Sequence, residues 1–92
     1  MGQGFLPTRG EFRGMVHAVI MVKTEAGEAE AALERILDLE NVSEAHIVAG
    51  AWDIIVETDA ERMQDLVGVS SSGIQKIAGV RDTKTYISMS AD

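Results

Sequence analysis

Two short segments of the sequence carry side chains suited to holding a small polar molecule. In the first, Val48 to Asp53, Gly50 exposes backbone N–H and C=O groups and Asp53 offers a carboxylate to an ammonium group. In the second, Asp82 to Thr85, the hydroxyls of Thr83 and Thr85 share one face of a predicted strand. Together these groups suit a small zwitterion. A plain hairpin and a polar edge strand are the structural alternative.

The residues that catalysis or metal binding would require are scattered along the chain. His17 and His46 lie on separate predicted strands, without the short spacings of a metal motif. The serines at 70–72 have no nearby histidine in sequence, so a helix break or cap explains them better than a nucleophile. No Gly-Lys-Ser/Thr phosphate loop is present, and the glutamates at 25, 28, 30 and 34 form a solvated helix face. We expect no catalytic residue, no metal and no cofactor.

Composition narrows the range of partners. The 92 residues carry a formal net charge of −7, with a pI of about 4.7, and this field repels nucleic acid and anionic membranes. No apolar run approaches the roughly 20 residues of a membrane span. The absence of cysteine fits a reducing compartment, and we expect the protein in the cytoplasm.

The patterned segments alternate between strand and helix. Residues 1–14 hold four glycines and the single proline without periodicity, which predicts a mobile tail before a domain at residues 15–92. Val16 to Lys23 reads as a buried strand. Glu28 to Leu39 reads as an amphipathic helix, with its apolar side at Ala29, Leu33, Ile36 and Leu37. Strands follow at Val42 to Ala49 and Trp52 to Thr58, joined by a two-residue turn at Gly50 and Ala51.

The second half repeats the order of helix and strand. Asp59 is the expected N-cap of a second helix, whose predicted buried stripe consists of Met63, Leu66, Val67, Ser70, Ile74 and Ile77. Gly68 and Gly73 predict an irregularity around residues 70–73. A last strand is expected from Asp82 to Met89. The order predicts an α+β, ferredoxin-like βαββαβ fold, with a four-stranded antiparallel sheet and two helices on one face.

Both faces of the predicted sheet are apolar. In the first strand, Ala18, Ile20 and Val22 point to one side, and Val19 and Met21 point to the other. Ile55 occupies the second face in the third strand. Two helices cover only one face, so we expect dimerisation through the other. Burial of each large apolar side chain in the dimer would contribute a free energy of about 1.5–3 kcal/mol. An ordinary surface with some exposed apolar atoms is the alternative.

The chain resembles the effector-binding (RAM) domain of the Lrp/AsnC transcriptional regulators. The resemblance covers Met15 to about Ser90 and rests on the opening Val-His-Ala-Val-Ile-Met-Val-Lys-Thr, on the Gly50-x-x-Asp53 hairpin and on Gly79-Val80 followed by Thr83-x-Thr85. No helix-turn-helix fits within these residues, so the chain resembles the stand-alone members. The resemblance implies dimers that pack sheet against sheet and associate further, often into octamers.

The same resemblance implies amino-acid binding near the hairpin, at contacts between dimers. It assigns Gly50, Ala51, Trp52 and Asp53 to the turn, Thr83 and Thr85 to the strand contribution, and Ser70 and Ser71 to a weaker contribution from the irregular helix. The expected function is a non-catalytic amino-acid sensor that modulates transcription through partner assembly, including assembly with full-length Lrp/AsnC regulators. The alternatives are a small enzyme of the dimeric α+β barrel type, with His17 or His46 recruited to haem, and a purely structural assembly partner.

Overall fold

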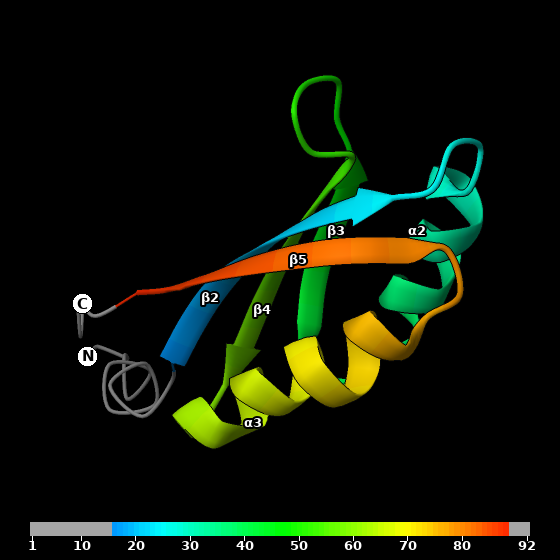
Figure 1. Ribbon diagram of the computed structural model, residues 1–92. Coiled ribbons are helices and arrows are strands. Elements are labelled where there is room, and N and C mark those ends of the chain that lie inside the picture. Colours follow the sequence, from blue (N-terminus) through cyan, green and yellow to red (C-terminus); the bar gives the residue numbers. More distant parts are fainter. Residues whose placement is uncertain (1–15, 89–92) are drawn as a thin grey trace, which may run out of the picture.

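The computed structural model describes residues 16–88, which form one sheet with helices on one side (Figure 1). The expected tail at residues 1–14, the expected domain start at Met15 and the expected strand end at Met89 lie outside the described residues. The elements in chain order are β2 (Val16–Thr24), α2 (Ala29–Leu37), β3 (Val42–Ile47), β4 (Ile54–Ala60), α3 (Met63–Gly68), a π-helix (Val69–Gly73), a 3-10 helix (Ile74–Lys76) and β5 (Val80–Ile87).

The sheet confirms the predicted ferredoxin-like fold. Its four strands run in the order β3-β4-β2-β5, and each neighbouring pair is antiparallel. The two central strands, β2 and β4, are the segments with the highest density of Val and Ile. Central strands are shielded on both edges, which favours β-branched residues there.

The core lies between the sheet and the helices. As predicted, Ala18, Ile20 and Val22 point to the helix side, where Ile20 and Val22 pack with Ile36 of α2 and Ile74 of the 3-10 helix. All five of these side chains have no exposed surface. Each large aliphatic side chain buried in this way contributes about 1.5–3 kcal/mol, so this layer holds the helices against the sheet.

The helix stripes differ from the prediction in detail. Leu37, Met63 and Val67 were expected in the core but are about half exposed, whereas Ala32 and Val69 are buried. α2 ends at Leu37 instead of Leu39, and the π-helix adds a residue to the turn that follows Gly68. Leu66, Ser70, Ile74 and Ile77 are buried as predicted, and Val69 at the start of the π-helix is buried beside them.

Asp59 does not cap the second helix, contrary to the prediction. It lies within β4, opposite His17 of β2, and β4 continues to Ala60. The residue at the N-cap position of α3 is Arg62, which makes no side-chain capping bond. The backbone ladder between β2 and β4 extends further than the sequence pattern indicated, and it holds Asp59 in extended conformation.

The expected two-residue hairpin turn at Gly50 and Ala51 is also wrong. β3 stops at Ile47 and β4 starts at Ile54, so residues 48–53 form a longer hairpin loop that projects from the sheet (Figure 1). Val48 N–H donates to the Asp53 carbonyl at 2.8 Å and closes the loop at its base. Trp52 is half-buried in this loop and is not a strand residue. We call residues 48–53 the hairpin loop.

The last strand begins earlier than predicted, at Val80 in place of Asp82. A register shift between Lys23 and Thr24 of β2 lets Thr24 pair with Val80, which adds residues 80–81 to the sheet. In the described part of the chain, no helix has the length and apolar character needed to cross a membrane.

Candidate functional site

The carboxylate of Asp53 is engaged by the chain itself. Its Oδ2 accepts a hydrogen bond from the Thr24 backbone N–H at 2.7 Å and another from the Thr24 hydroxyl at 3.2 Å. The Asp53 backbone N–H also donates to the Val22 carbonyl at 2.9 Å. Asp53 therefore ties the base of the hairpin loop to the end of β2, which is a structural role that the sequence did not indicate.

This arrangement lowers the pKa of Asp53. The main cause is the hydrogen bond from the Thr24 backbone, which stabilises the ionised carboxylate. Partial burial opposes the shift, while the Thr24 hydroxyl and the positive charges of Lys23 and Arg81 support it. Asp53 is thus held as a carboxylate whose best-placed oxygen already has two donors.

The remaining hairpin residues present backbone to solvent. Gly50 has a φ of 154°, in the range where side chains are disfavoured, and a Cβ added there would meet no neighbouring atom. The carbonyl of Ala51 accepts a hydrogen bond from the Lys23 ammonium at 2.7 Å. The tip of the hairpin loop is accordingly open to contact by another molecule.

The predicted hydroxyl residues of β5 meet the irregular helix. Thr85 Oγ1 donates to Ser70 Oγ at 3.1 Å, and Gln75 Nε2 donates to Thr83 Oγ1 at 2.9 Å. Thr83 and Thr85 pair with Val22 and Ile20, so they lie on the helix side of the sheet. The structure thereby brings Ser70, Thr83 and Thr85 to one surface, where the π-helix packs beside β5. π-helical turns occur frequently at functional sites.

Ser71 is not part of this group. Its hydroxyl donates to the Val67 carbonyl one turn earlier, at 2.9 Å. Such a bond back to the helix occupies the side chain locally. Of the two serines expected at the site, only Ser70 reaches β5.

A pocket opens beside the hydroxyl residues, at the start of β5. Its volume is about 210 Å³, and it is lined by Gln75, Val80, Arg81, Asp82 and Thr83. We call it the β5 pocket. It is smaller than the roughly 300–1,000 Å³ of a drug-sized site, and so fits a small molecule. The lining residues carry a guanidinium, a carboxylate, a carboxamide and a hydroxyl, and Asp82 pairs with Lys23 on the sheet face opposite to Thr83.

Gln75 and Arg81 were not among the residues predicted for the site, and Asp82 had no predicted role. The signal available was the opposite-charge dipeptide Arg81-Asp82 directly before Thr83-x-Thr85. Nothing in the pattern indicated Gln75, because its approach to Thr83 depends on how the 3-10 helix packs against β5. Thr83 is the one predicted residue that also lines the pocket.

The hairpin loop and the β5 pocket occupy separate places in the protomer. Within residues 16–88, no hydrogen bond joins residues 48–53 to Ser70, Thr83 or Thr85. The strand β2 lies between them, since Val22 pairs with Ile54 on one side and with Thr83 on the other. The predicted site is therefore split in a single chain.

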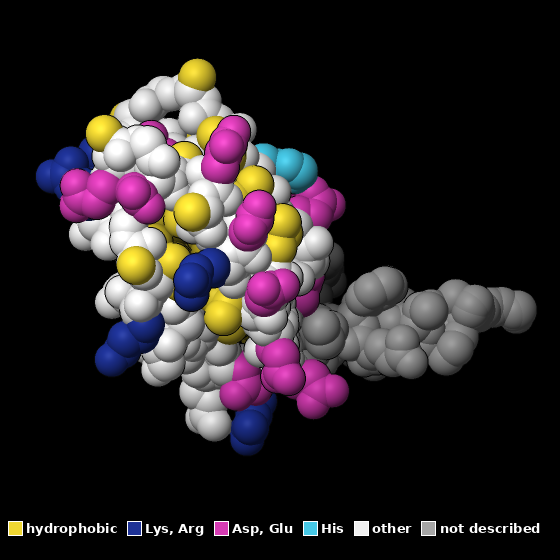
Figure 2. All heavy atoms as spheres, turned by 90° about the vertical axis from the view of Figure 1, so that its right-hand side faces the viewer, with side chains coloured by type: hydrophobic (Ala, Val, Ile, Leu, Met, Phe, Trp, Pro, Cys, Tyr) yellow, Lys and Arg dark blue, Asp and Glu magenta, His cyan; other side chains and the backbone are white. Residues whose placement is uncertain are grey.

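A second hollow lies in the helix layer, between residues 39–41 and residues 64–73. Its volume is about 350 Å³, and its lining includes the carboxylates of Glu40 and Asp65 without any Lys or Arg. Acidic side chains also spread over the face of the molecule seen in Figure 2, with hydrophobic side chains between them. An anionic group of a ligand would find no cation in this hollow, which makes the β5 pocket the better candidate.

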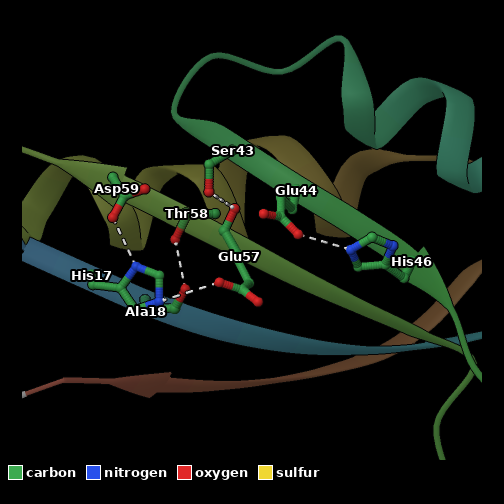
Figure 3. A network of polar contacts seen from close by, with 8 residues as sticks. All are labelled: His17, Ala18, Ser43, Glu44, His46, Glu57, Thr58 and Asp59. Atoms are coloured by element: carbon green, nitrogen blue, oxygen red, sulfur yellow. Dashed lines mark hydrogen bonds and ion pairs between the residues drawn. The ribbon is translucent and has the colours of Figure 1, made fainter.

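Both histidines lie on the sheet face opposite the helices, which we call the open face (Figure 3). His17 Nδ1 is 2.7 Å from Asp59 Oδ1, and its Nε2 is 3.6 Å from Glu57 Oε1. His46 Nε2 is 2.9 Å from Glu44 Oε1. Neither histidine reaches the interior between sheet and helices. In the span 16–88, no three His, Cys, Asp or Glu side chains are arranged to hold a metal ion.

Comparison with known proteins places these features in a family. The family model described as Lrp/AsnC ligand binding domain matches residues 17–91. An uncharacterized HTH-type transcriptional regulator of Pyrococcus furiosus is 34% identical over 55 residues, which cover 60% of this chain and 37% of that protein. The chain thus matches little more than a third of this relative's length.

Solved structures share the fold. The crystal structure of FFRP-DM1 is 31% identical with a TM-score of 0.76, and the match covers 80% of this chain and 99% of that one. The transcriptional regulator of Neisseria meningitidis in complex with L-Met is 15% identical with a TM-score of 0.74, covering 98% of this chain and 59% of that one. At that identity the second comparison shows the fold alone. The chain belongs to the Lrp/AsnC family, and its described fold is that family's ligand binding domain.

Proposed function

We propose that this chain is a non-catalytic, cytoplasmic module that binds an amino-acid effector and acts on transcription by assembling with regulators of its own family. The observation that carries the proposal is the β5 pocket, where Arg81, Asp82 and Thr83 offer groups of both charges and a hydroxyl within one small cavity. An α-amino acid has the complementary groups, a carboxylate and an ammonium, on one carbon. The N. meningitidis relative in complex with L-Met supports this class of ligand.

We propose further that the chain dimerises through the open face. Val19, Met21 and Ile55 are only partly covered there, and Tyr86 beside them is 54% exposed. A second copy would remove this apolar surface from water, at about 25 cal/mol per Å². Figure 3 shows that polar contacts of His17 with Glu57 and Asp59, and of His46 with Glu44, run along the same face, and polar groups of this kind occur at the rim of interfaces.

Assembly beyond the dimer would complete the binding site. The tip of the hairpin loop and the β5 pocket lie apart in one chain, so the hairpin of one dimer has to reach the pocket of another for all the predicted residues to meet. An octamer is the assembly we expect. Full-length Lrp/AsnC regulators present the same kind of domain, and mixed assemblies would connect this module to DNA.

The haem-enzyme alternative requires a histidine facing a cavity between helices and sheet. His17 and His46 face away from the helices, and Ile20, Ile36 and Ile74 fill the space between the layers. The alternative predicts a shift of the haem absorption band on titration, and we expect none. A purely structural partner would form the same assemblies without saturable amino-acid binding.

Calorimetric titration of the 92-residue chain with each of the twenty L-amino acids tests the proposed binding. We expect saturable binding of at least one. The variants Thr83→Val and Thr85→Val, which remove hydroxyls with little change of shape, should weaken it by about 2- to 10-fold each, the usual range for one hydrogen bond. Ser72→Ala, which removes an exposed hydroxyl outside the β5 pocket, is the control. Absence of binding by all twenty would contradict the sensor role.

A further inference from the structure

We infer that two copies of the chain bind one Zn²⁺ ion between their open faces, with His17 and Glu57 of each copy as its ligands. This inference rests on the proposed dimer and adds a metal site to it. Asp59 acts as a positioning residue for His17. No sequence motif marks such a site, because its ligands come from two strands and from two chains.

His17 and Glu57 are diagonal neighbours on the open face. His17 belongs to β2 and Glu57 to β4, two adjacent central strands whose register directs both side chains away from the helices (Figure 3). Nε2 of His17 is 3.6 Å from Oε1 of Glu57, which is longer than a hydrogen bond. Two ligand atoms on a tetrahedral zinc, each about 2.0–2.1 Å from the metal, lie about 3.3 Å apart. The pair therefore has nearly the separation that a shared zinc ion requires.

The carboxylate of Asp59 orients the imidazole ring of His17. Its Oδ1 is 2.7 Å from Nδ1 of His17, the length of a charge-assisted hydrogen bond. When Nδ1–H donates to a carboxylate, the lone pair of Nε2 is free to bind a metal ion, and zinc-binding histidines are commonly held in this way. Asp59 thus favours the tautomer and the ring direction in which Nε2 can bind zinc beside Glu57.

The carboxylates around this pair have no Lys or Arg as partner. In the described part of the chain, the ion pairs of Glu44, Glu57 and Asp59 are with histidines. Glu44 lies directly across from Glu57 in the register of β3 and β4, and Nε2 of His46 is 2.9 Å from its Oε1. A dimer that closes over these groups would bury negative charge, which is unfavourable without a compensating cation. A divalent cation in the interface removes this cost.

One chain supplies half of the coordination shell. Structural zinc sites have four protein ligands, and within residues 16–88 no three His, Cys, Asp or Glu side chains are arranged around one metal position. Glu57 is the middle residue of β4 (Ile54–Ala60), a central strand, so it lies near the centre of the open face. A two-fold axis brings the same residues of both copies together. Two His17–Glu57 pairs that meet at this centre complete the shell.

The ligand types favour zinc over harder cations. Each copy contributes an imidazole nitrogen and a carboxylate oxygen, and zinc accepts both in tetrahedral geometry. Mg²⁺ and Ca²⁺ prefer a shell made of oxygen ligands. The two Glu57 carboxylates together balance the charge of one divalent ion, so the occupied site is neutral.

Zinc titration of the untagged 92-residue chain, after removal of metal with a chelator, tests the inference. Calorimetry should show one ion bound for every two chains. Sedimentation equilibrium should show dimerisation about 10-fold tighter when free zinc is at about ten times its dissociation constant, because an ion that binds only the dimer stabilises it by mass action. Cobalt(II), as a probe of the same site, should give the intense visible absorption of tetrahedral coordination.

Variants separate the ligands from the positioning residue. His17→Asn and Glu57→Gln should each abolish the effect of zinc on dimerisation. Asp59→Asn should lower zinc affinity by about 10- to 100-fold and leave the cobalt spectrum unchanged in shape, because the ligands stay the same. His46→Asn is the matched control, since His46 is an exposed histidine beside a carboxylate on the edge strand β3. It should bind zinc like the wild type, and circular dichroism confirms that each variant folds.

The possible failures are distinguishable. If the wild-type chain dimerises but zinc leaves the dimerisation constant unchanged, the metal site is wrong and the proposed dimer stands. Zinc binding that survives in both His17→Asn and Glu57→Gln, or a stoichiometry of one ion per chain, also contradicts the shared site. A chain that is monomeric with and without zinc contradicts both the site and the dimer.

Discussion

The side chain of Asp53 shows how a residue suited to ligand chemistry can be committed to the fold. The sequence places it after a glycine turn, where a carboxylate would be available to a ligand. In the structure, Thr24, which is 29 positions away, donates two hydrogen bonds to it. This pairing depends on the register of β4 against β2, and no local pattern reveals that register. Asp53 is better understood as the anchor of the hairpin loop.

We expect Asp53→Asn to change how stability depends on pH. The pKa of Asp53 in the folded chain lies below its ordinary value of 3.8. Its stabilising contribution is therefore fully present at pH values above the unfolded-state pKa, and is lost as the pH falls through the folded-state pKa. Thermal melts from pH 7 to pH 2.5 should show the wild type more stable than the variant near neutrality, with the difference shrinking below about pH 4.

Asp38→Asn serves as the control for that experiment, because Asp38 is exposed and lies at the end of α2. Its melting temperature at pH 7 should stay close to that of the wild type, because an exposed side chain contributes little to stability. Parallel curves for Asp53→Asn and the wild type would instead show that the bonds from Thr24 do not depend on ionisation.

Among the elements, the segment after α3 has the greatest effect on the site. The glycines at 68 and 73 indicated an irregular helix, and the structure confirms it as a π-helix followed by a 3-10 helix. The predicted inward position of Ser70 is confirmed, and the structure adds its contact with Thr85. Ile74 and Ile77, which follow the π-helix, are buried as predicted, whereas Met63 and Val67 before it are about half exposed. Helical periodicity assumes a constant 3.6 residues per turn, so one stripe cannot fit every position of a segment that passes from an α-helix through a π-helix to a 3-10 helix.

Two glycines should respond in opposite directions to alanine. Gly79 has a φ of 93°, and a Cβ there would lie 2.9 Å from the Cβ of Glu28, so Gly79→Ala should lower the free energy of unfolding by about 2 kcal/mol or more. Gly68 is helical, and a Cβ there would have no neighbour within 4 Å. Gly68→Ala should therefore raise the free energy of unfolding by up to about 1 kcal/mol.

Urea denaturation measures both effects, and each variant is the other's control because the added methyl group is the same. Similar effects in the two variants would contradict the conformational argument at Gly79. An unchanged affinity for amino acids in Gly68→Ala would further separate helix stability from the binding surface.

At the level of the whole molecule, the order of elements and the two-sided character of the sheet followed from the sequence. Alternating apolar residues identified the central strands, and Ala18, Ile20 and Val22 lie on the helix side as predicted. The site was only partly predictable. Thr83, Thr85 and Ser70 converge, but the β5 pocket also needs Arg81 and Gln75, and only tertiary packing brings those side chains together.

The proposed dimer makes a prediction for Met21, near the centre of the open face. Met21→Lys would place a charge in an apolar contact, and should weaken dimerisation by about 30-fold or more, since an unpaired buried charge costs at least about 2 kcal/mol. Sedimentation velocity at micromolar concentration should show the wild type as a dimer or larger and the variant shifted toward monomer.

Leu37→Lys is the control for the dimer, because Leu37 is 51% exposed on the helix side of the molecule. It should leave pairing through the open face intact. A monomeric wild-type chain would exclude the proposed interface, and a dimeric Met21→Lys variant would place the interface on another surface.

Thr24 and Glu25, at the end of β2, contact both the hairpin loop and the start of β5. Thr24 holds the base of the hairpin loop through Asp53, and the next residue, Glu25, donates its N–H to the Gly79 carbonyl and pairs with Arg81. Two consecutive residues therefore connect the hairpin loop with the β5 pocket, although β2 separates the two. A ligand that binds Arg81 in place of Glu25 would break the ion pair at Glu25, directly next to the residue that holds the hairpin loop. Binding in the pocket would then act on the loop that we propose contacts a neighbouring subunit.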